Sequence, residues 1–146
     1  MKILVINGPN LNLLGRREPG IYGTTSLSGI EEIMLASAKI SDIKLEFFQS
    51  NHEGAIIDKI HEMMDDYDGC VINPGAYTHY SYAIYDAMRA VKKPFIEVHI
   101  SDVDSREKFR SVSVTAPACI KKIAGRGIDG YVDALLEIAE YIKTNK

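Results

Sequence analysis

Residues 44–73 read KLEFFQSNHEGAIIDKIHEMMDDYDGCVIN, and this stretch decides the fold. Short apolar runs at Lys44–Gln49 and Cys70–Asn73 enclose a segment in which apolar residues recur at i, i+1, i+4, i+7 and i+8: Ile56, Ile57, Ile60, Met63 and Met64. That spacing places them on one face of a helix. A strand, a helix and a second strand in this order predict two parallel strands joined by a right-handed crossover.

The same alternation continues along the rest of the chain. Three further apolar runs predict strands: Lys2–Ile6, Phe95–His99 and Ile120–Ala124. Helical stripes lie between and after them, and the first helix is predicted to start near Thr25, with Ser28 and Glu31 as a capping box one turn later. Five strands alternating with helices predict an α/β domain over residues 1–146. Its flavodoxin-like parallel sheet has the strand order 2-1-3-4-5 and is flanked by helices.

Composition and charge restrict the class of protein, its partners and the compartment in which it is expected. The chain has 146 residues, of which 46% are hydrophobic and 25% charged, as in globular proteins that bury their own core. Its net charge of −3 argues against nucleic acid as a partner. The first apolar run is too short for a signal peptide or a membrane helix, so no membrane partner is expected. Cys70 and Cys119 lack the spacing of a disulfide framework and predict the reducing cytoplasm.

Ligands of such sheets bind beyond the carboxyl ends of the strands, where the strand order reverses. Residues 7–23, which follow the first strand, form a connection much longer than the usual 2–6 residues. This segment combines asparagines, arginines and a tyrosine with glycines and prolines. It is therefore interpreted as a binding loop or lid, and a disordered surface loop is the alternative.

The third and fourth strands end in further polar residues. Asn73 closes the third strand, Thr78 is predicted to cap the helix that follows, and His79 lies at the start of that helix. Glu97 and His99 stand at i and i+2 of the fourth strand and so share one face. A carboxylate beside an imidazole suits a general acid or base. The alternatives are a structural edge pair and, for His79, a plain surface histidine.

Several kinds of site are excluded by the motifs that the sequence lacks. The four histidines show no metal-ligand spacing, and no phosphate-binding glycine motif follows a strand. A phosphorelay receiver would need an acidic residue where Asn73 stands. Two hypotheses remain at this point: an enzyme, or a non-catalytic module that binds a small molecule or nucleotide.

The sequence resembles the type II 3-dehydroquinate dehydratases over about residues 2–143. Six motifs in the family's order carry the resemblance: NGPNL at 7–11, LGRREP at 14–19, IYG at 21–23, QSNHEG at 49–54, NPGAYTH at 73–79 and EVHIS at 97–101. The resemblance implies loss of water from 3-dehydroquinate by anti elimination through an enolate, in the shikimate pathway, with no metal and no cofactor.

The resemblance also implies roles for individual residues. Tyr22 matches the base that removes the C2 proton, and Arg17 matches the arginine of a lid over about residues 10–23 that keeps this tyrosine ionised. Asn10 matches the residue that holds a water against the enolate oxygen. His99 matches the acid that protonates the departing hydroxyl, with Glu97 as its partner.

Further positions of this sequence match the family's binding residues and contacts between subunits. The substrate-binding positions are Asn73, His79, Ile100, Ser101 and Arg110, and Arg110 is expected to face the substrate carboxylate. Asp86 matches a residue that reaches the site of a neighbouring subunit, since the family assembles as trimers packed into a dodecamer. The sequence departs from the family at Tyr85, where a basic residue is expected, in a helix that also carries Tyr80 and Tyr82 near its start.

Overall fold

The computed structural model describes residues 1–146 and confirms the predicted sheet. Its five parallel strands are ordered β2-β1-β3-β4-β5. They are β1 (Lys2–Asn7), β2 (Lys44–Gln49), β3 (Gly69–Asn73), β4 (Phe95–His99) and β5 (Lys121–Ala124). The predicted strands are correct to within one residue at each end.

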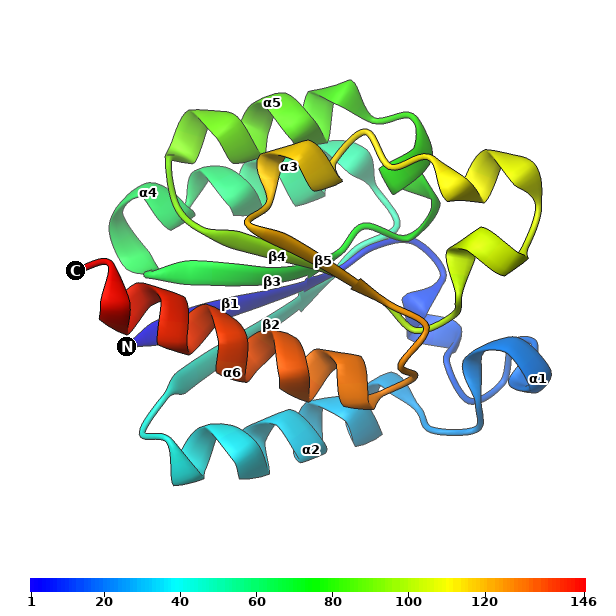
Figure 1. Cartoon of the computed structure of the whole chain (residues 1–146), viewed down its shortest axis with the longest axis horizontal. Helices are drawn as coiled ribbons and strands as arrows, with labels where there is room; N and C mark the ends of the chain where they lie inside the picture. Colours follow the sequence, from blue (N-terminus) through cyan, green and yellow to red (C-terminus); the bar gives the residue numbers. More distant parts are fainter.

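Helices cover both faces of this sheet (Figure 1). One face is packed by α2 (Leu27–Ile40) and α6 (Asp129–Thr144), and the other by α3 (Glu53–His61), α4 (Met63–Asp66) and α5 (Tyr82–Val91). A hydrophobic core lies on each face of the sheet, and successive residues of β1 point into opposite cores. Ile3 and Val5 pack towards α2 and α6, and Leu4 and Ile6 pack towards α3 and α5.

Three local predictions differ from the structure, and for the two helix caps the reason is a competing hydrogen bond. The first long helix begins at Leu27, where Ser26 Oγ accepts a 3.1 Å bond from Gly29 N, so Ser28 and Glu31 form no capping box. Thr78 does not cap α5, since Ser81 Oγ accepts from Ile84 N at 3.1 Å. The apolar stripe over residues 56–64 is divided at Glu62 between α3 and α4.

The segment between β1 and α2 is ordered into short helical turns. It contains a 3-10 helix at Leu11–Leu13 and α1 at Pro19–Tyr22. Leu11 and Leu14 are buried in the core shared with α2, whereas α1 buries no residue. Four more 3-10 helices lie in the connections around β4: Gly75–His79, Val103–Ser105, Lys108–Ser111 and Ala116–Ala118.

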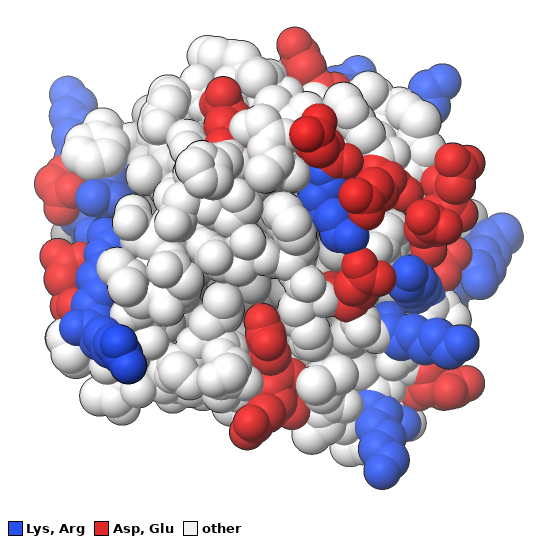
Figure 2. All heavy atoms as spheres, turned by 180° about the vertical axis from the view of Figure 1, so that it is seen from behind, with Lys and Arg blue, Asp and Glu red and all other residues white.

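The ends of β1 and β3 approach each other closely at the edge where ligands are expected. Gly8 N donates to Asn73 O at 2.8 Å, and a Cβ atom at Gly8 would collide with the carbonyl of Pro74. Only glycine therefore allows the chain to leave β1 in this direction. On the face seen in Figure 2, acidic and basic side chains are intermixed around a broad uncharged area.

None of the helices has the length and apolar character that crossing a membrane requires.

Candidate active site

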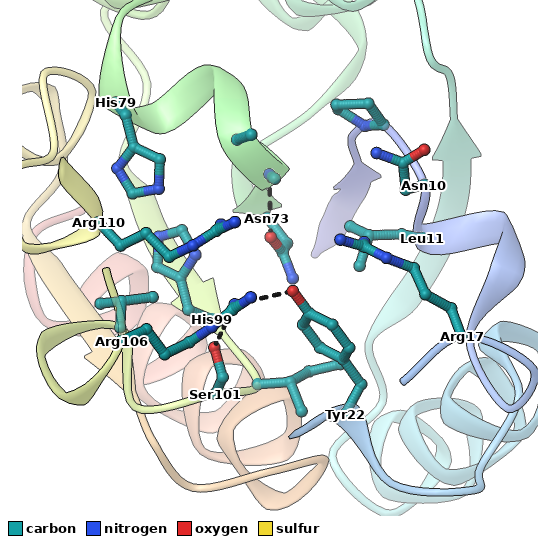
Figure 3. A pocket seen from close by; sticks show the side chains of 15 residues that line it. Asn10, Leu11, Arg17, Tyr22, Asn73, His79, His99, Ser101, Arg106 and Arg110 are labelled. Carbon is teal, nitrogen blue, oxygen red and sulfur yellow. Dashed lines mark hydrogen bonds between the residues drawn. The ribbon is translucent and has the colours of Figure 1, made fainter. Parts of the chain in front are cut away.

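A cavity of about 250 Å³ opens beyond the carboxyl ends of β3 and β4, next to the segment that follows β1. This is the place where the strand order reverses (Figure 3). Most of the residues expected from the sequence line it: Asn10, Arg17, Tyr22, Asn73, His79, His99, Ile100, Ser101 and Arg110. Glu97 lies behind His99, and exposed Asp86 on α5 lies outside the cavity.

A carboxylate–imidazole pair forms one wall of the cavity. His99 Nε2 lies 2.6 Å from Glu97 Oε1, and Glu97 is fully buried. Burial alone raises the pKa of the Glu97 carboxyl, but hydrogen bonds from His99, Thr115 and Thr78 bring it below its ordinary value. Because Glu97 holds Nε2, the ring nitrogen of His99 left for a ligand is Nδ1. The predicted neighbours on one face of β4 are thus in direct contact.

Tyr22 ends α1 with two guanidinium groups close to its ring. The Cζ atoms of Arg17 and Arg106 lie 4.9 Å and 5.2 Å from the ring centroid. Arg106 Nη1 also donates to the phenol oxygen at 2.8 Å and to Ser101 Oγ at 3.3 Å (Figure 3). Arg17 instead pairs its Nε with Glu18 Oε2 at 3.3 Å. The Tyr22 phenol oxygen is thus the acceptor of a hydrogen bond from a charged donor.

Arg106 is the residue that sequence reasoning missed. It belongs to the connection after β4, where no hydrophobic period and no spacing rule marks a functional position. The single signal of function is its place in the chain: this connection begins just after His99, at the edge of the sheet where ligands are expected. Its Nε is buried without a hydrogen-bond partner, so the guanidinium keeps one donor unused.

Buried amides at the strand ends fix the floor of the cavity. Asn73 Nδ2 donates to Tyr131 Oη at 2.9 Å, and its Oδ1 accepts from Gly75 N at 3.1 Å. Tyr131, fully buried on α6, in turn donates to Asn7 Oδ1 at 2.6 Å. Asn73 therefore has one amide hydrogen left for a ligand. Asn10 adopts a left-handed conformation (φ 69°) and donates its N–H to Asn51 Oδ1 at 3.0 Å.

The remaining polar residues form the outer rim. His79 Nδ1 donates to Val112 O at 2.7 Å, and burial lowers the pKa of this imidazole. Arg110 Nε pairs with Glu107 Oε2 at 2.6 Å, which leaves its two terminal nitrogens for another partner. Together with Arg17 and Arg106, Arg110 makes the cavity positive. The site therefore suits an anionic ligand, and it places a phenol and an imidazole where they can take part in acid–base chemistry.

Comparisons with known proteins point to one family. The family described as dehydroquinase class II matches residues 1–139. A 3-dehydroquinate dehydratase of Caldicellulosiruptor saccharolyticus is 57% identical over 142 residues, which cover 97% of this chain and 98% of the relative.

Two solved structures are also similar. The type II dehydroquinase of Butyrivibrio crossotus superposes with a TM-score of 0.93 at 54% identity, covering 95% of this chain and 97% of that one. The type II dehydroquinase of Propionibacterium acnes gives a TM-score of 0.89 at 40% identity, covering 97% and 96%.

Proposed function

This chain belongs to the dehydroquinase class II family, and from that premise we propose which of its residues perform the reaction. The enzyme is a lyase that removes water from 3-dehydroquinate to give 3-dehydroshikimate, a step of the shikimate pathway that supplies aromatic amino acids. One observation carries the assignment of roles. The Tyr22 phenol, in contact with a guanidinium, and the His99–Glu97 pair line the same cavity.

Tyr22 acts as the base in this proposal. Its phenolate takes the C2 proton, and the electrons of the broken C–H bond form an enolate with the neighbouring ketone. Arg106 stabilises the phenolate through the 2.8 Å contact, and Arg17 stabilises it from the ring side. A water held by Asn10 donates to the enolate oxygen.

His99 acts as the acid. The enolate expels the hydroxyl group, and the Nδ1 proton of His99 converts it to water, so that the products are a conjugated enone and neutral imidazole. Glu97 accepts from Nε2 throughout and stabilises the imidazolium before the transfer. No metal or cofactor enters these steps.

Substrate is held by the rim and floor of the cavity. We assign its carboxylate to the free terminal nitrogens of Arg110, and its hydroxyls to the polar groups that face the cavity: Asn73, His79, Ser101 and the backbone of Ile100. Residues 10–23 serve as the lid over the bound substrate, within a single catalytic domain. Support comes from α1, which buries no residue and carries the base.

We further propose the family's dodecamer of trimers as the assembly. Asp86 is exposed on α5 and lies outside its own cavity, as expected of a residue that reaches a neighbouring subunit. Tyr82, the first residue of the same helix, and Tyr80, two residues before it, are 66% and 61% exposed, and we assign them to the interface between subunits. The two free cysteines, Cys70 and Cys119, fit a cytoplasmic protein.

Formation of the enone can be followed by its ultraviolet absorbance. We expect turnover by the wild type and none by Tyr22→Phe, which keeps the ring but has no acidic proton to lose. Ligand binding should be largely retained, and Tyr141→Phe, at a 41% exposed position on α6, should be fully active. Substantial turnover by Tyr22→Phe would refute Tyr22 as the base. A wild-type protein that binds dehydroquinate without forming the enone would leave only the binding-module alternative.

A further inference from the structure

The buried carboxylate of Glu97 receives more hydrogen bonds than the imidazole alone provides. Besides His99, Oε1 lies 2.6 Å from Thr78 Oγ1 and 2.9 Å from Ser113 Oγ, and Oε2 lies 2.6 Å from Thr115 Oγ1. We call Thr78, Ser113 and Thr115 the hydroxyl cradle. Thr78 and Thr115 are 1% and 0% exposed, so their hydroxyls have no bulk water to bond instead.

The cradle joins two segments that are distant in the sequence. Thr78 lies in the 3-10 helix at Gly75–His79, and the other two hydroxyls come from the connection between β4 and β5. Val114 N donates to Thr78 O at 2.7 Å, and His79 Nδ1 donates to Val112 O at the same distance. These contacts hold the connection against the 3-10 helix, and so place all three hydroxyls on one side of Glu97.

Counting protons shows which form of Glu97 the cradle selects. Each hydroxyl has one proton, and all three can point at the carboxyl group only when it accepts on both oxygens, that is, when it is ionised. A protonated carboxyl group would donate to one of these hydroxyls, and that hydroxyl would turn its own proton elsewhere, for example across the 2.9 Å contact between Thr115 Oγ1 and Thr78 Oγ1. Protonation would therefore cost the carboxyl group one of its three hydroxyl donors. The carboxyl group of Glu97 has a lowered pKa despite its burial, and the ionisable neighbours His79 and Cys119 lie close enough for its charge to act on them.

We infer that Thr78, Ser113 and Thr115 are positioning residues for the acid step: they fix Glu97 as an oriented carboxylate, so that His99 keeps its proton on Nε2 and presents Nδ1 to the departing hydroxyl. This inference rests on the proposed role of His99. The cradle does not touch the cavity, and it affects only the second half of the reaction. Removal of the C2 proton by Tyr22 does not depend on it.

That separation gives a readout that general damage to the fold does not produce. In deuterated water, an enolate that fails to eliminate is reprotonated with deuterium, and the recovered dehydroquinate carries label at C2. In Thr115→Val, which removes the sole cradle donor on Oε2, we expect kcat to fall by roughly tenfold. KM should stay within about twofold, and the ratio of C2 exchange to turnover should rise by roughly tenfold. Thr115→Ser restores the hydroxyl and the wild-type ratio.

Matched variants make each outcome decisive. Thr144→Val removes a threonine hydroxyl at the far end of α6 and should match the wild type in every measurement. Ser113→Ala, at the half-buried member of the cradle, should raise the ratio less, because Oε1 keeps two other donors. If Thr115→Val does not fold, Ser113→Ala decides the matter by itself.

An unchanged ratio in the folded variant, whether turnover is normal or lowered, overturns the inference. The proposed function fails separately, if the wild type itself gives neither enone nor C2 exchange. A wild type that turns over beside a Thr115→Val protein with an unchanged ratio refutes the cradle's role alone.

Discussion

Replacement of Arg106 tests the contact on which the base depends. Arg106→Gln removes the positive charge and the 2.8 Å hydrogen bond to the Tyr22 oxygen, together with the 3.3 Å bond to Ser101. Arg126→Gln is the matched control. It also removes one arginine charge, but Arg126 pairs with Asp133 in an exposed position outside the cavity.

The expected effect follows from the geometry. A hydrogen bond to a charged partner contributes about 1.5–3 kcal/mol, and about 1.36 kcal/mol corresponds to a tenfold change in rate. Because the phenol must lose its proton before it can act, we expect kcat of Arg106→Gln to fall by about 10- to 150-fold. Arg106→Lys should lie between this variant and the wild type, since an ammonium keeps the charge but cannot contact Tyr22 and Ser101 with one planar group.

The measurement is the initial rate of enone formation across a range of substrate concentrations, with folding checked by circular dichroism. Arg126→Gln should keep the wild-type kcat. An Arg106→Gln protein whose kcat stays within about threefold of the wild type would contradict the reasoning, since a loss that small is below the range for a hydrogen bond to a charged group.

Three further predictions concern other contacts. Arg17→Lys should severely lower turnover, because an ammonium does not replace a planar guanidinium over the Tyr22 ring, and near-normal activity would remove Arg17 from the mechanism. Tyr131→Phe should lower the free energy of unfolding, measured in urea, by about 2–4 kcal/mol, since the amides of Asn7 and Asn73 both lose a buried partner. Hydrogen bonds, foremost from Lys59, lower the pKa of Glu46 from 4.5 to about 2. The folded protein should therefore lose stability as the pH falls from 4.5 towards 2, and urea titrations should find a smaller loss in Glu46→Gln.

The sheet could be predicted closely because its strands are buried on both faces. Such strands appear in the sequence as continuous apolar runs, and helices of regular period separate them here. The start of α2 was harder to place, because Ser26 and Ser28 are both suitable N-cap residues and lie only two positions apart. Ser26 prevails through its bond from Gly29 N, and the local sequence contains nothing that ranks the two.

Site residues were predictable where the backbone determines their direction. Glu97 and His99 share a face because strand side chains alternate, and Asn73 lies at the switch point because it ends β3. Thr78 was misassigned as a helix cap, since its buried carboxylate partner lies on a different strand and cannot be inferred from local sequence. Arg106 lies among short 3-10 helices, and its direction is set by tertiary contacts with Tyr22 and Ser101.

The proposed acid and base stand on parts of the fold that differ in burial. His99 ends a strand whose five residues are all buried, whereas α1 buries none and begins after Glu18, a non-glycine residue at φ 40°. Among the side chains of residues 15–23, Tyr22 alone forms a hydrogen bond to the rest of the chain, and its partner is Arg106. In the proposed mechanism, this one contact both fastens the lid segment and stabilises the phenolate. The proposed base would then act only where the segment is docked, and loss of Arg106 should impair closure and chemistry together.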